Sequence, residues 1–209
     1  MLMSGALYGV MVVAGAGGAK MLGVPVHVSV TAEALAQGVV WAVPMVALML
    51  TVSSERAQRM YKPLRATIDF CVTSIVPTIG GVSVRGLAFL SACAGIGEEM
   101  FFRGLGQGAL AAALAGAAWC AHPQATAIAV VSLIFGLLHA ATPAYGVLAT
   151  LAGAYLGFQY VWCDNLLAPV LSHALYDFAA FLKLRDNAAR RLETAGGIAG
   201  DTAVPSRAD

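Results

Sequence analysis

Three ionisable side chains interrupt an apolar segment at residues 97–104, which read Gly-Glu-Glu-Met-Phe-Phe-Arg-Gly. They are Glu98, Glu99 and Arg103. If this segment crosses a membrane, each charge at the middle of the helix costs roughly 2.5–3.5 kcal/mol on an insertion scale. A chain that keeps all three must pair them, place them near the membrane interface, or use them in acid–base chemistry.

Helical spacing gives the two glutamates different surroundings. Glu99 and Arg103 are four residues apart, which separates them by about 40° around a helix, with the acid on the favourable N-terminal side. Glu98 lies about 100° from Glu99 and about 140° from Arg103. We therefore expect Glu99 and Arg103 to form a structural ion pair and Glu98 to be the carboxylate free for chemistry. The alternative is an interfacial cluster of charges without any chemistry.

Two histidines lie on other apolar segments. His139 ends the run VVSLIFGLLHA, and Phe135 precedes it by one helical turn. His173 lies in APVLSHALYDF, and Asp177 follows it four residues later. That spacing puts His173 and Asp177 on one face of a helix, within reach of each other or of one small ligand. Together with a free glutamate, these side chains predict a polar pocket.

Other chemistries have little support in the sequence. It contains no Gly-x-Ser-x-Gly elbow, no Walker A loop and no His-Glu-x-x-His helix. The four cysteines stand singly in apolar runs, so we expect reduced, space-filling thiols rather than disulfides or a zinc finger. His27 and His122 lie beside prolines, and we expect them to be solvated turn residues.

The composition indicates where such a pocket must lie. Of 209 residues, 11% are charged and 59% are hydrophobic, whereas roughly 25% of the residues of a soluble domain are charged. Mean hydropathy is +0.79, and the formal net charge is only +1. These values exclude an ordinary soluble enzyme, a disordered protein and a nucleic-acid-binding protein. They predict an integral membrane protein.

The expected fold is all-α, a polytopic bundle of about seven to eight transmembrane helices. The candidate spans are 2–19, 33–53, 68–84, 86–102, 105–119, 125–141, 145–162 and 166–183. The segment 105–119 either crosses the membrane or re-enters it, and the sequence leaves both possibilities open. We expect one membrane domain over residues 1–185, with the motifs in 86–183, and a disordered polar tail over 186–209.

Basic residues predict the orientation. Residues 55–65 hold four of them, and residues 183–191 hold four more. Because lysine and arginine concentrate in cytoplasmic loops, both segments are expected on the cytoplasmic side. An even number of crossings must then lie between them.

Taken in order, the three motifs resemble those of a known family. Glu-Glu-x-x-x-Arg, Phe-x-x-x-His and His-x-x-x-Asp/Asn are typical of the CAAX prenyl protease and bacteriocin-processing family. This is also called the CPBP or Abi family of intramembrane glutamic endopeptidases. The resemblance covers about residues 86–183. It implies a multi-helix bundle whose active site lies inside the membrane and is open to water on one side.

The resemblance also implies residue roles. Glu98 would be the general base, and His139 would help to hold and polarise a water molecule that attacks a peptide carbonyl. His173 and Asp177 would stabilise the oxyanion, and the Glu–Arg pair of the first motif would support the site. No cofactor is implied. The partners would be the lipid bilayer and a protein or peptide substrate at the membrane, and the location the plasma membrane of a bacterium.

Asp177 departs from many relatives, which carry asparagine at this place. An ionised aspartate cannot donate a hydrogen bond to an oxyanion. Either Asp177 is protonated, or it orients His173 and stabilises the imidazolium form, which could then donate as a charged group. We favour the second role.

Two other functions remain open from the sequence. Two glutamates and two histidines could bind Zn²⁺ in a metalloprotease of the same architecture, although their spacing is not a known zinc signature. A non-catalytic membrane module, such as a chaperone, an immunity factor or a small transporter, could use the polar cluster for binding. The substrate, the prenylation of that substrate and the oligomeric state are not determined by the sequence.

Overall fold

The computed structural model describes residues 2–201, with side chains over 6–193, and this part of the chain is helical without any strand. The helices are α1 (Leu2–Met21), α2 (Ala32–Val52), α3 (Glu55–Met60), α4 (Lys62–Ser74), α5 (Val76–Ile79), α6 (Val84–Glu99), the π-helix η1 (Met100–Gln107), α7 (Gly108–Ala115), α8 (Pro123–Leu138), α9 (Pro143–Cys163) and α10 (Leu167–Asp201). The predicted all-α fold is confirmed.

Local signals in the sequence determine where several helices begin and end. The hydroxyls of Thr31, Ser83 and Thr142 cap α2, α6 and α9 by accepting a hydrogen bond from a backbone N–H of the first turn. At the other end of α9, Asp164 takes a left-handed conformation with φ of 45°. This residue turns the chain back toward α10.

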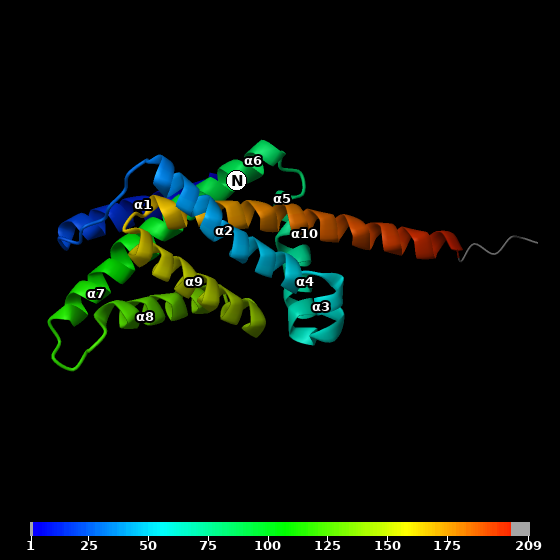
Figure 1. The fold of residues 1–209 in the computed structure, drawn as a ribbon. Coiled ribbons are helices and arrows are strands. Elements are labelled where there is room, and N and C mark those ends of the chain that lie inside the picture. The colour runs from blue at the N-terminus through cyan, green and yellow to red at the C-terminus, as the bar shows by residue number, and fades with distance from the viewer. Residues whose placement is uncertain (1, 202–209) are drawn as a thin grey trace, which may run out of the picture.

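Two spans expected as separate helices form one. α6, η1 and α7 follow each other without a break, and Figure 1 shows them as a single green run across the molecule. The expected spans 86–102 and 105–119 therefore lie on one continuous helical run. The expected span 68–84 is not one continuous helix, because α4 ends at Ser74 and the short helix α5 begins at Val76, with Pro77 in its first turn. Within residues 2–201, two of the eight expected spans thus share one helical run, and one is divided between α4 and α5.

The bundle is built from pairs of neighbouring helices. α2 packs along α10, α8 pairs with α9, and α1 packs against α6 and η1 (Figure 1). α6 also packs against α10, so the helices that carry the first and third motifs are in direct contact.

Buried polar side chains join helices that are distant in the sequence. Gln107 Nε2 donates to the carbonyl of Gly157 at 3.1 Å. Ser172 Oγ donates to the carbonyl of Gly38 at 2.8 Å and accepts from Gln159 Nε2 at 2.9 Å. Such interhelical hydrogen bonds replace part of the hydrophobic driving force that is absent between helices in lipid.

The outer surface fits a lipid environment. Among the described residues, three helices are long and apolar enough to cross a membrane, at Ala32–Val52, Pro143–Cys163 and Leu167–Glu193, and Ala6–Met21 and Pro123–Leu138 are shorter apolar helices. Large apolar side chains on α2, α8 and α9 point outward, including Val39, Val43, Leu133, Leu137, Val147 and Leu151. The protein is a membrane protein.

The C-terminal segment differs from the expectation. α10 continues as far as Asp201, through the first part of the segment expected to be a disordered tail, and residues 202–209 lie outside the described part. Helical ion pairs support this continuation, because Asp186 binds Lys183 at 2.9 Å and Arg190 at 3.0 Å.

Candidate active site

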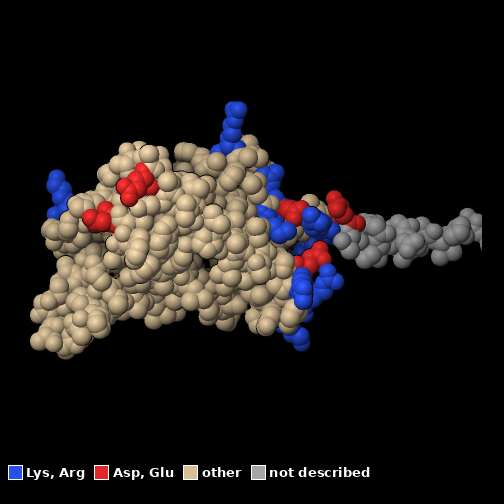
Figure 2. Space-filling view, in the orientation of Figure 1, with Lys and Arg blue, Asp and Glu red and all other residues tan. Residues whose placement is uncertain are grey.

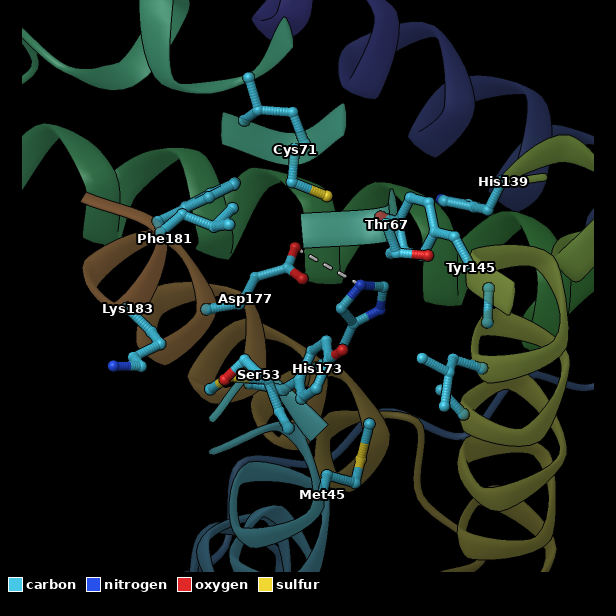
Figure 3. Close-up of a pocket in the computed structure, with 18 of the residues that line it drawn as sticks. Met45, Ser53, Thr67, Cys71, His139, Tyr145, His173, Asp177, Phe181 and Lys183 are labelled. Carbon is cyan, nitrogen blue, oxygen red and sulfur yellow. Dashed lines mark hydrogen bonds and ion pairs between the residues drawn. The ribbon is translucent and has the colours of Figure 1, made fainter. Parts of the chain in front are cut away.

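The four residues expected to perform the chemistry line one pocket. Glu98 comes from the end of α6, His139 from the end of α8, and His173 and Asp177 from α10. The pocket has a volume of about 290 Å³, and α1, α2, α4 and α9 complete its wall. Figure 3 shows His173 and Asp177 of α10 at this space, with His139 of α8 on its other side.

Glu99 and Arg103 form the predicted buried ion pair beneath the pocket. Arg103 Nη1 donates to Glu99 Oε1 at 2.9 Å, and the two side chains are 1% and 0% exposed. Arg103 Nη2 donates to the carbonyl of Gly153 on α9 at 2.9 Å, and the guanidinium lies 5.0 Å from the centre of the Phe135 ring. The pair therefore connects η1 to both α8 and α9.

His173 contacts three carboxylates. Its Nδ1 lies 2.7 Å from Glu99 Oε1, and its Nε2 lies 3.5 Å from Asp177 Oδ2 and 4.0 Å from Glu98 Oε2. Because a carboxylate only accepts hydrogen bonds, this arrangement favours protons on both ring nitrogens. The expected contact with Asp177 is present, but Glu99 is the closer partner and fixes the orientation of the ring.

His139 is held by the helix that it terminates. It is the C-cap of α8, and its Nδ1 donates to the carbonyl of Phe135 at 2.8 Å, since a carbonyl accepts only. The ring stacks on that of Phe135 with 4.2 Å between centres. With the proton on Nδ1, a neutral His139 presents the lone pair of Nε2 to Glu98, whose Oε2 lies 3.8 Å away.

Glu98 meets the two histidines at ion-pair distance, without a hydrogen bond to either. Its side chain is 12% exposed, and its Oε2 has no hydrogen-bond partner within the described part of the chain. A buried polar atom is normally hydrogen-bonded. The unpaired oxygen faces the two histidine Nε2 atoms and the cavity, which is where a water molecule or a substrate would bind.

Several pocket residues were not predicted from the sequence. Three tyrosines line the cavity, namely Tyr8 from α1, Tyr145 from α9 and Tyr176 from α10. Tyr145 gave the best signal, because it follows His139 closely and stands in the first turn of a helix capped by Thr142. The two histidines expected in turns lie away from the pocket: His27 is exposed and lies 3.3 Å from Asp164, and His122 is exposed before α8.

The positions of the ligand-type side chains bear on the possibility of a metal site. Within the described residues, no group of three or more histidine, cysteine, aspartate or glutamate side chains is placed to hold a metal ion. The four cysteines are free, and Cys71 is the one that is buried at the pocket.

Comparison with known proteins gives one match, to a protein family. A family model described as type II CAAX prenyl endopeptidase Rce1-like matches residues 81–179, which include all three motifs. No curated protein and no solved structure matches the chain. Residues 81–179 are thus similar to the CAAX protease family, as the motifs predicted, and this similarity indicates a membrane protease.

Proposed function

We propose that this protein is an intramembrane endopeptidase of the glutamic type, which needs no metal. It hydrolyses a peptide bond of a membrane-associated or lipid-modified protein in the plasma membrane of a bacterium. The observation that carries the proposal is the unpaired Glu98 Oε2, 3.8 Å from His139 Nε2 and 4.0 Å from His173 Nε2. A base, a water-holding imidazole and a cationic donor thus surround one small space.

The spacing of Glu98 and His139 suits a shared water molecule. Their facing atoms are too far apart, at 3.8 Å, for a direct hydrogen bond. A water molecule at about 2.8 Å from each of these two atoms fits between them and would donate one hydrogen bond to each. Its lone pairs would then face the pocket, toward the carbonyl carbon of the substrate.

The reaction follows from this placement. The water oxygen bonds to the carbonyl carbon, Glu98 takes the proton, and the carbonyl electrons move onto the oxygen. The Nε2–H of His173 stabilises that oxyanion. When the intermediate collapses, the carbon–nitrogen bond breaks and Glu98 returns the proton to the leaving amine. General base action contributes about 10²–10⁴ in rate, and an oxyanion donor about 10²–10³.

Replacing Glu98 by glutamine tests the proposal, because the amide keeps the shape of the side chain but cannot take the proton. We expect Glu98→Gln to lose proteolysis by at least about 10²-fold while the protein stays folded. Membranes that contain wild type or Glu98→Gln would be compared by proteomics for a cut that disappears. A peptide spanning that cut then serves for kinetics.

The matched control is Glu55→Gln. Glu55 is an exposed acid paired with Arg59 at 2.7 Å, and the cut should persist in this variant. Full activity of Glu98→Gln would remove this carboxylate from the mechanism and contradict the proposal.

Metal independence has its own test. Incubation of the purified protein with a strong zinc chelator should leave the cleavage rate unchanged, since protein groups alone supply the base and the oxyanion donor. Inactivation that added Zn²⁺ reverses would instead establish the zinc-dependent alternative.

A further inference from the structure

The oxyanion donors are the incomplete part of this site. His173 supplies one donor, the Nε2–H, and this atom also faces Asp177 Oδ2 at 3.5 Å. As a carboxylate, Asp177 offers no proton of its own. Oxyanion sites commonly use more than one donor aimed at the developing charge. A chain with aspartate at position 177 therefore needs a second donor from elsewhere in the pocket.

Tyr145 stands in the wall of the pocket beside the residue proposed to hold the water. Its ring meets that of His139 edge to face, with 6.2 Å between centres and planes at 84°. Figure 3 shows Tyr145 on the same side of the pocket as His139, across from Asp177. A carbonyl oxygen between His173 and Tyr145 would leave its carbon open to the water on Glu98.

The backbone at Tyr145 is firmly held. Its N–H donates to Thr142 Oγ1 at 3.1 Å, which caps α9. Thr142 Oγ1 in turn lies 2.6 Å from Thr67 Oγ1 on α4. The first turn of α9 is thus fixed to a second wall of the pocket, and a side chain on that turn starts from a defined position, as transition-state stabilisation requires.

The hydroxyl of Tyr145 is uncommitted. No side chain or backbone group of the described residues hydrogen-bonds it. Asp177, Glu98 and Tyr176 line the same pocket. A phenol is a neutral hydrogen-bond donor. It can donate to an oxyanion without forming an ion pair with the carboxylates of the pocket, as a second cation would.

We propose that the Tyr145 hydroxyl is a catalytic oxyanion donor, which works together with His173 Nε2 and supplies the proton that Asp177 lacks. This inference rests on the proposed peptidase function and adds a specific residue to it. The hydroxyl keeps its proton throughout and strengthens its hydrogen bond as charge develops on the carbonyl oxygen.

The test is the kinetics of Tyr145→Phe on the peptide defined above. We expect kcat to fall about 10²–10³-fold with KM nearly unchanged, because the hydrogen bond strengthens in the transition state. The control is Tyr160→Phe on the same helix. Tyr160 lines a different cavity, which shares no residue with the active-site pocket, so kcat should stay at the wild-type value.

A second variant separates a catalytic role from a structural one. Asp177→Asn introduces an amide donor, so in the Tyr145→Phe background it should restore at least about tenfold of the lost kcat, whereas damaged packing would not be rescued. Wild-type kcat in Tyr145→Phe, a change in KM alone, or absence of rescue would each overturn the inference. These outcomes leave the proposed function intact, since that is judged by Glu98→Gln.

Discussion

At the scale of single residues, the site is a balance of buried charges. Glu98, Glu99 and Asp177 supply three carboxylates around the ring of His173, and Arg103 pairs with Glu99. Glu99 lies at hydrogen-bond distance from both Arg103 and His173, whereas Glu98 Oε2 lies 4.0 Å from His173 Nε2. This separation is what the proposed role of Glu98 as general base requires.

The Glu99–Arg103 pair should contribute strongly to folding. Removing one partner of a buried ion pair leaves an uncompensated charge and typically costs about 3–5 kcal/mol. We expect Arg103→Met to lower the unfolding free energy in detergent micelles by about this amount, since both side chains are fully buried. Denaturant titration measures the change.

Arg59→Met is the comparison for that variant. Arg59 binds Glu55 at the same i, i+4 spacing, but the two side chains are 76% and 70% exposed. An exposed pair contributes about 1 kcal/mol or less. Equal destabilisation by the two substitutions would mean that burial does not determine how much the Glu99–Arg103 pair contributes to the free energy of unfolding.

Spacing along one helix predicted the contacts within each motif, and not those between motifs. The pair of Glu99 with Arg103 and the contact of His173 with Asp177 followed from a four-residue step. The hydrogen bond of Glu99 to His173 joins residues 74 positions apart and depends on how α6 packs on α10. Tyr145 was missed for the same reason. Its helix, α9, carries none of the three motifs, and its contact with His139 depends on how α8 and α9 pack.

At the scale of elements, the π-helix η1 is the feature that sequence periodicity could not give. It begins at Met100, directly after the two glutamates, and extends to Gln107. π-helical turns are rare and often occur at functional sites. The positions of side chains around the helix axis differ there from those in an α-helix, yet Arg103 Nη1 still lies 2.9 Å from Glu99 Oε1. The π-helix keeps the run continuous from α6 into α7, whereas the sequence predicted separate spans at 86–102 and 105–119.

Close packing of α6 on α10 should control the geometry of the active site. A Cβ atom at Gly95 would lie 2.7 Å from the carbonyl oxygen of Val170 and 3.2 Å from the nitrogen of Ala174, and neither backbone atom can move away easily. Gly95→Ala should therefore separate the helices that carry Glu98 and His173. We expect a loss of about 1–3 kcal/mol of stability, and a larger relative loss of peptidase activity.

Gly17→Ala provides the reference for this substitution. Gly17 lies in α1 with no atom within 4 Å of an added Cβ, so alanine there should be neutral or slightly stabilising. Thermal unfolding and cleavage rate would be measured for both variants. If Gly95→Ala matched Gly17→Ala in both, close approach of α6 and α10 would not be what aligns the site.

At the scale of the whole molecule, charge is concentrated at one end. Figure 2 shows most lysine and arginine side chains gathered where α3, α4 and the C-terminal half of α10 lie. Arg191 of α10 binds Asp69 of α4 at 2.7 Å, so the two basic segments meet on one face, as the expected common side requires. Four successive helical segments lie between the two basic segments, namely the run from α6 to α7, α8, α9 and α10. An even number of segments is what the expected topology requires.

The basic face should be cytoplasmic, because positively charged segments are retained on that side of the membrane. Single cysteines would be placed at Lys62, on this face, and at His122, at the opposite end between α7 and α8, in a background with alanine at the four native cysteines. In intact cells, a membrane-impermeant maleimide should label His122→Cys and spare Lys62→Cys, and lysis should expose both. Because Ser53 and Lys183 line the active-site pocket at the basic end, this orientation would also open the site toward the cytoplasm. Labelling of Lys62→Cys in intact cells would contradict both the cytoplasmic location of the basic face and the opening of the site toward the cytoplasm.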